Sequence, residues 1–142
     1  NPNRLPGIVL DDSQAQLTGA WSRSAAMGGY VGEGYLHDNA EGRGSKSATF
    51  TPDIPKAGRY EIRLAYTPYS NRATNAKVVI DVDGKKTAVA VNQRQTPPVD
   101  RAFVSLGQFD LPAGKSCRVT ISNEGADGHV IVDAVQFLPV RQ

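Results

Sequence analysis

Residues 59–67 read RYEIRLAYT, and apolar and polar side chains alternate along this segment more regularly than anywhere else in the chain. Successive side chains of a β-strand point to opposite faces of the sheet. One face of this segment would therefore carry Tyr60, Ile62, Leu64 and Tyr66, and the other would carry Glu61, Arg63 and Ala65. The pattern predicts a strand with one face in the core.

Similar short segments lie on both sides of it. Residues 77–83 and 86–91 flank Asp83-Gly84, a dipeptide typical of a tight β-hairpin turn. Gly, Pro, Asn and Asp separate further strand candidates, at residues 7–11, 16–21, 47–51, 102–111, 118–123 and 129–138. About nine or ten short strands with regular turn signals predict an all-β, antiparallel β-sandwich of the jelly-roll type. We expect one domain over residues 7–140, a linker at residues 1–6 and a long glycine-rich loop over residues 22–44.

Composition excludes several classes of protein. The formal net charge is only +2 and the longest basic cluster is Lys85-Lys86, which argues against nucleic-acid binding. No apolar run approaches the ~20 residues that cross a bilayer, so we expect no membrane partner. A single cysteine, Cys117, rules out an internal disulfide and reads as a small buried side chain. The opening residues read as a linker, so we infer a segment excised from a longer chain.

Catalytic patterns are absent from the sequence. His37 and His129 are the only imidazoles, and neither lies in a recognisable nucleophile motif. Asp11 and Asp12 are adjacent, so on a strand they would face opposite ways and would not form a glycosidase pair. We therefore expect that this chain is not an enzyme.

Two other features indicate sites. Tyr69, Asn71 and Arg72 combine an aromatic ring, an amide and a guanidinium on one loop, as sugar binding requires. Packing of that loop against itself is the alternative. Asp133 interrupts the apolar run VIVDAV of residues 130–135, which predicts a central strand. A carboxylate there needs a cation, a basic side chain or backbone donors.

The motifs together resemble the golvesin C-terminal and xanthan lyase carbohydrate-binding-like domain family. The resemblance covers about residues 8–139. It rests on GAWSRS (19–24), GYVG (29–32), GYLHD (34–38), PKAGRYEI (55–62) and NEGADGHVIVDAVQF (123–137). More distantly, the chain is similar to carbohydrate-binding module families six and thirty-five. The resemblance implies a galactose-binding-like jelly roll that is secreted by bacteria and attached to polysaccharide-active proteins.

This resemblance also implies site residues. A cleft between end loops would involve Tyr30 or Tyr35, the segment 94–101 and Asn123. That segment has no aromatic residue, but Arg94 and Arg101 suit the carboxylates of an acidic polysaccharide. The related families hold a structural Ca²⁺ ion, and Asp11 or Asp12 together with Asp133 occupy the matching places. No other cofactor is expected.

Two functions remain open at this stage. The first is a non-catalytic carbohydrate-binding module whose partners are a polysaccharide and the catalytic domain of the same parent chain. The second is a structural or adhesive spacer that packs on that catalytic domain without affinity for sugar. A large exposed apolar patch would favour the spacer.

Overall fold

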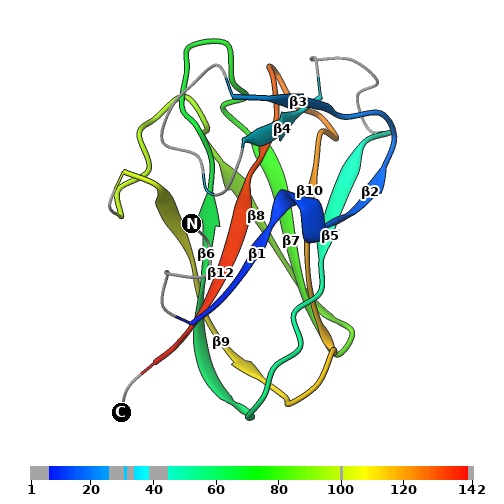
Figure 1. Cartoon of the computed structure of the whole chain (residues 1–142), viewed down its shortest axis with the longest axis vertical. Helices are drawn as coiled ribbons and strands as arrows, with labels where there is room; N and C mark the ends of the chain where they lie inside the picture. Colours follow the sequence, from blue (N-terminus) through cyan, green and yellow to red (C-terminus); the bar gives the residue numbers. More distant parts are fainter. Residues whose placement is uncertain (1–6, 26–30, 32–33, 39–44, 100, 141–142) are drawn as a thin grey trace.

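The computed structural model describes residues 7–25, 31, 34–38, 45–99 and 101–140, and nearly all regular structure is β-strand (Figure 1). One short 3₁₀ helix, η2 (Asp12–Gln14), interrupts the strands. The strands are β1 (Ile8–Asp11), β2 (Gln16–Thr18), β3 (Ser22–Ser24), β4 (Tyr35–His37), β5 (Ser47–Phe50), β6 (Gly58–Ala65), β7 (Ala76–Val82), β8 (Lys85–Val91), β9 (Phe103–Leu111), β10 (Cys117–Ser122), β11 (Ile131–Val132) and β12 (Ala134–Pro139).

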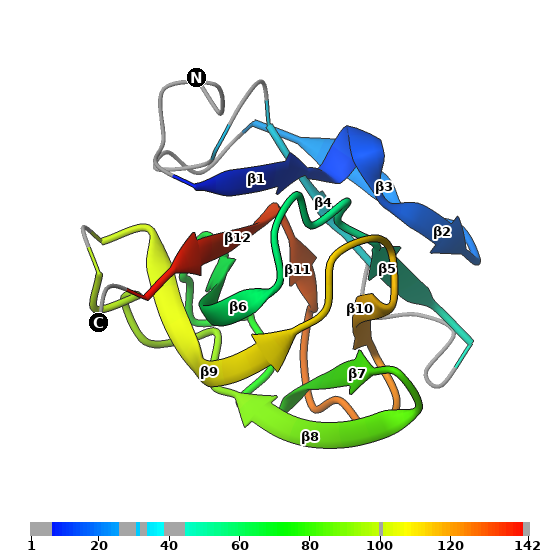
Figure 2. The same ribbon diagram turned by 90° about the horizontal axis from the view of Figure 1, so that it is seen from below.

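Two antiparallel sheets face each other and form a sandwich (Figure 2). The first sheet has the order β1-β12-β6-β9, and the second has the order β2-β5-β10-β7-β8. A third, smaller sheet of order β11-β4-β3 lies across one end of the sandwich, at the top of Figure 1. The predicted all-β antiparallel sandwich is confirmed.

The core is built by the alternation that the sequence predicts. On β6, Tyr60, Ile62 and Leu64 are buried, whereas Glu61 and Arg63 are only partly covered. The opposite sheet supplies buried side chains from β7 and β10, namely Val78, Ile80, Val119 and Ile121. Burial of each such side chain contributes roughly 1.5–3 kcal/mol, which makes this interface the main stabilising element of the fold.

The predicted hairpin turn is confirmed as well. Strands β7 and β8 pair from Ala76↔Val91 to Val82↔Lys85, with Asp83 and Gly84 between them. Both turn residues have positive φ angles, 52° and 90°, as a two-residue type I′ hairpin turn requires. This turn lies at the opposite end of the sandwich from the small sheet (Figure 1).

Two segments differ from the expectation. Part of the stretch 22–44, expected to be a loop, forms β3 and β4, which pair as Ser22↔His37 to Ser24↔Tyr35. Three-residue strands are too short to reveal a period of two between glycines. The predicted strand 129–138 is in fact two strands, because the chain leaves the small sheet after β11 and joins the first sheet as β12. Asp133 lies at this change of sheet.

Two features predicted from the sequence fall on residues that the structure does not describe. The proposed linker at residues 1–6 and the side chain of Tyr30 lie outside the described residues. Within the described part of the chain, no helix is both long enough and apolar enough to span a bilayer.

Candidate functional site

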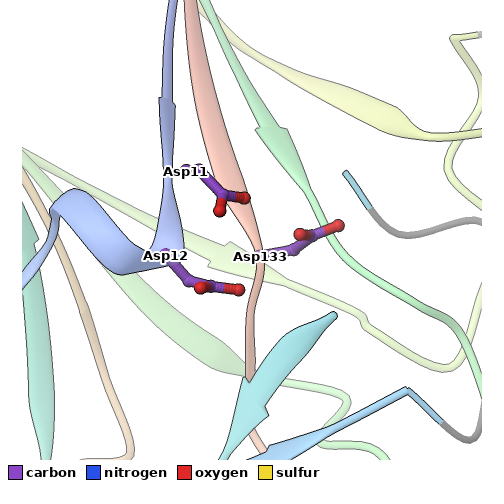
Figure 3. A group of neighbouring side chains, drawn as sticks. All are labelled: Asp11, Asp12 and Asp133. Atoms are coloured by element: carbon purple, nitrogen blue, oxygen red, sulfur yellow. The ribbon is translucent and has the colours of Figure 1, made fainter. Parts of the chain in front are cut away.

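Three aspartates meet where β1 ends beside β12 (Figure 3). Asp11 pairs with Ala134 across these antiparallel strands, so Asp12, which follows Asp11, lies close to Asp133, which precedes Ala134. One carboxylate oxygen of each aspartate lies within 4.8 Å of the others. We call this group the aspartate cluster. It unites the three residues that the sequence singled out as candidate metal ligands.

Only some of the carboxylate oxygens in the aspartate cluster accept hydrogen bonds from the described residues. Asp133 Oδ2 accepts a hydrogen bond from the Val31 backbone N–H at 2.8 Å, and Asp12 Oδ1 accepts one from Arg23 Nη2 at 2.6 Å. A second oxygen of each of these two residues and Oδ1 of Asp11 are buried without a hydrogen-bond partner among the described residues. Buried acceptors are rarely left unsatisfied, so these oxygens are suited to serve as ligands of a cation.

The electrostatics agree with the hydrogen bonding. Burial, and to a smaller degree the charges of Asp12 and Asp11, raise the pKa of Asp133 to about 8. Burial also raises the pKa of Asp11 and of Asp12. The half-exposed guanidinium of Arg23 forms an ion pair with Asp12, and its charge also acts to lower the pKa of Asp11 and of Asp133, so one positive charge faces three carboxylates. A hard divalent cation, which prefers oxygen ligands, fits this donor set. Sequence reasoning missed Arg23 and the Val31 N–H, because neither carries a local signal for this site.

A second group of candidate residues gathers around Arg72 in the β6–β7 loop. Its guanidinium is buried and donates from Nε to the Thr67 carbonyl (3.0 Å) and from Nη1 to Asn71 Oδ1 (2.8 Å). The same group lies 5.6 Å from the ring centroid of Tyr35 and 5.8 Å from that of Tyr69. Such distances are those of cation–π contacts. Arg72 therefore holds the surrounding side chains in place.

Three exposed side chains surround this buried guanidinium. The Tyr69 ring is 50% exposed, although most aromatic rings of the chain are covered. Asn71 and Arg94 are also exposed, and Arg94 Nε donates to the Arg72 carbonyl at 2.6 Å. We call Tyr69, Asn71, Arg72 and Arg94 the loop-end cluster. The structure thus brings together four of the predicted ligand-binding residues.

The remaining predicted residues do not join this exposed surface. Tyr35 is 2% exposed and packs beneath Arg72. Asn123 is fully buried, with Oδ1 accepting from the Lys46 N–H and Nδ2 donating to Asp38. Both side chains therefore support the loops from within. Arg101 is exposed in the turn closed by the Val99↔Phe103 bridge, and no contact of the described residues connects it with Arg72.

The two histidines lie next to the loop-end cluster. Their ring centroids are 5.9 Å apart, and His129 Nδ1 lies 3.3 Å from the Asn71 carbonyl oxygen. Burial lowers the pKa of His37, and the neighbouring His129 and Arg72 lower it further. A neutral His37 is the result at pH 7. Sequence reasoning did not pair the two imidazoles, because they are 92 positions apart in the chain.

Comparisons with known proteins agree with this architecture. The sequence profile of the Golvesin C-terminal domain family matches residues 8–139. A xanthan lyase from Bacillus sp. (strain GL1) is 35% identical over 142 residues, which is 96% of this chain and 15% of that protein. The structure of a Paenibacillus xanthan lyase matches with a TM-score of 0.88 at 29% identity, over 94% of this chain and 13% of that one.

A more distant structure shows the same fold. The Podospora anserina GH26-CBM35 β-(1,4)-mannanase matches with a TM-score of 0.70 at 22% identity, over 95% of this chain and 28% of that one. The present chain therefore spans only a small share of the proteins that it matches, 15% of the curated xanthan lyase.

Proposed function

The chain belongs to the Golvesin C-terminal domain family, and from this premise we propose that it is a non-catalytic carbohydrate-binding module. Its relatives are xanthan lyases, in which the matching part is a small share of the whole chain. We propose accordingly that it serves as an accessory domain of a secreted bacterial polysaccharide-active protein. Its partners would be a polysaccharide and the catalytic domain of the same parent chain.

The observation that carries this proposal is the exposed ring of Tyr69 beside the Arg72 guanidinium. Sugar sites combine an aromatic face with a few fixed polar groups, and here Tyr69, Asn71 and Arg94 all contact Arg72. Arg72 fixes this arrangement from below, so that little side-chain freedom is lost when a ligand binds. The guanidinium of Arg94 suits a carboxylate-bearing sugar, which supports an acidic polysaccharide as the ligand.

The aspartate cluster supports a structural role for a cation. We propose that Asp11, Asp12 and Asp133 hold a Ca²⁺ ion, with further oxygens from backbone carbonyls or water. The ion would compensate the buried carboxylates and tie β1 to the start of β12. It would stabilise the fold and take no part in a reaction.

The alternative function is a spacer that packs on a neighbouring domain. Such a role would be favoured by a large exposed apolar patch. Among the described residues, Leu17 and Tyr69 are the exposed large hydrophobic side chains, and they come from different strands and loops. No specific observation therefore favours the spacer over the binding module.

A polysaccharide array tests the proposal, with the purified domain probed in CaCl₂ and in EDTA. We expect retention on uronic-acid polymers, and at least about fivefold weaker retention for Tyr69→Ala and for Arg94→Ala. Leu17→Ala and Arg59→Ala are matched controls, because they remove an exposed apolar side chain and an exposed arginine elsewhere. The absence of binding to any glycan at millimolar concentration would refute the proposal and favour the spacer.

A further inference from the structure

The outer face of the five-stranded sheet is hollowed. Alternation along β5, β7 and β10 turns Phe50, Ile80 and Val119 toward the core, so their neighbours in sequence point outward. The outward side chains of the middle strands line an open hollow of about 640 Å³. We call this hollow the sheet groove. None of its lining residues belongs to the loop-end cluster or to the aspartate cluster.

A row of hydrogen-bonding side chains crosses the floor of the sheet groove. Gln16 pairs with Thr49, and Thr49 pairs with Thr120, on three adjacent strands. The two threonine hydroxyls lie 3.0 Å apart. Each hydroxyl both donates and accepts, as the hydroxyls of a sugar do. Neighbouring strands are ~4.8 Å apart, so a chain lying across them meets a new polar group at each strand.

The rim of the sheet groove is positively charged. Lys86, Lys115 and Arg118 line it, against a single carboxylate, Asp81. Asp81 Oδ1 already accepts the Gly84 N–H at 2.9 Å. None of the three basic side chains forms an ion pair within the described part of the chain. Unpaired cations along one hollow attract an anionic ligand.

The hollow continues toward the β7–β8 turn. A second hollow of about 310 Å³ shares Asp81, Lys115 and Arg118 with the first and extends it toward Gly84. The two together form an elongated path rather than a closed pocket. An extended polymer suits such a path better than a compact small molecule, which prefers an enclosed apolar cavity.

We propose that the sheet groove is a second binding surface, for an extended anionic polysaccharide whose carboxylates pair with Lys86, Lys115 and Arg118. A protein partner fits this surface less well, because the centres of protein interfaces are depleted of lysine and enriched in aromatic residues. Val79 is the largest apolar side chain of the lining, and the lining has no aromatic ring. The inference rests on the proposed function for its class of ligand, but it concerns different residues.

The test uses the intact domain in affinity electrophoresis, with polygalacturonate as the acidic probe and galactan as the neutral probe. The double variant Lys86→Ala/Lys115→Ala should bind polygalacturonate about tenfold more weakly, since two charge-assisted contacts are lost. The matched control is Lys56→Ala/Lys85→Ala, which removes the same charge from exposed positions outside the groove. Chemical-shift changes on titration should include the amides of Thr49 and Thr120.

The outcomes separate this inference from the proposed function. Equal binding of polygalacturonate by the two double variants, with loss in Tyr69→Ala, overturns the sheet groove and leaves the loop-end cluster intact. If the wild-type domain and both double variants bind galactan and none of them binds polygalacturonate, the sheet groove is likewise overturned and the loop-end cluster is unaffected. If the wild-type domain binds neither probe, the sheet groove is overturned, whereas the proposed function fails only if the polysaccharide array also shows no binding to any glycan. Residual polygalacturonate binding by Tyr69→Ala/Arg94→Ala that disappears on adding Lys86→Ala/Lys115→Ala supports two surfaces.

Discussion

Asn123 Nδ2 donates a hydrogen bond to Asp38 Oδ2 at 3.0 Å, although the two residues are 85 positions apart in the sequence. The other oxygen of Asp38 accepts the Val130 N–H at 2.9 Å, and Lys46 Nζ donates to the Asp38 carbonyl at 2.7 Å. All of these groups are buried. The network therefore ties the small end sheet to the loop after β10.

The first prediction concerns this network. Asn123→Ala removes one hydrogen bond from the Asp38 carboxylate and one from the Lys46 N–H. An unsatisfied buried group costs ~1–3 kcal/mol each, so we expect the free energy of unfolding to fall by about 2–4 kcal/mol in urea titrations. Asn75→Ala, at an exposed asparagine, is the control and should cost less than about 1.5 kcal/mol. A smaller loss for Asn123→Ala than for the control would contradict the structural role.

The second prediction separates support from contact in the loop-end cluster. Arg72→Ala removes a buried guanidinium and its hydrogen bonds to Thr67 and Asn71, and we expect it to destabilise the domain by about 2–4 kcal/mol. Arg94→Ala, at an exposed side chain, should change the unfolding free energy by less than about 1 kcal/mol. Chemical denaturation of both variants checks this order. The reverse order would show that Arg72 does not organise the loop.

The third prediction follows from the raised pKa of Asp133 and concerns the protein in EDTA. Its folded-state pKa of about 8 lies above the ordinary value of 3.8. The folded state therefore holds this proton more tightly than the unfolded state does. The free energy of unfolding should fall as pH rises from about 4 to about 8, by at most roughly 1.4 kcal/mol for each pH unit.

Asp133→Asn tests this directly. The variant lacks the titrating group, so its stability in EDTA should be flatter between pH 5 and 8 and should exceed that of the wild type at pH 8. Millimolar CaCl₂ should stabilise the wild type at pH 8 and should have little effect on Asp133→Asn, because the variant loses a proposed ligand. Asp53→Asn, at an exposed position, should behave as the wild type does. If neither calcium nor EDTA changes the melting temperature of the wild type, the proposed cation site is wrong.

The sequence is informative where a local pattern reports a tertiary role. The alternation of apolar and polar side chains along residues 59–67 predicts a strand with one buried face. Asp133 can be recognised in the sequence because it interrupts an apolar run. The burial of Arg72 has no such signal, because a guanidinium in a polar loop reads as solvated. Its partner Tyr35 lies 37 positions away in the sequence, on β4 of the small end sheet, so this contact exists only in the tertiary structure. The same holds for Asn123, whose partner lies in a distant loop.

The fourth prediction concerns the single cysteine. Cys117 begins β10, is 1% exposed, and pairs in register with Val82. Burial, and to a smaller degree the charge of Asp81, raise the pKa of its thiol to about 11. The thiolate is the reactive form, so the native protein should hardly react with a disulfide reagent such as DTNB at pH 8.

Reaction should then require opening of the core around β10. We expect the DTNB rate to rise with urea along the global unfolding transition, because central strands open only near the full free energy of unfolding. Labelling in 6 M guanidinium chloride is the control, and it should reach one thiol per chain within the mixing time. Native-state labelling at a rate close to that of the denatured chain would contradict the packing role. It would place Cys117 in a segment that opens locally, and the sheet groove beside β10 would then lack a rigid floor.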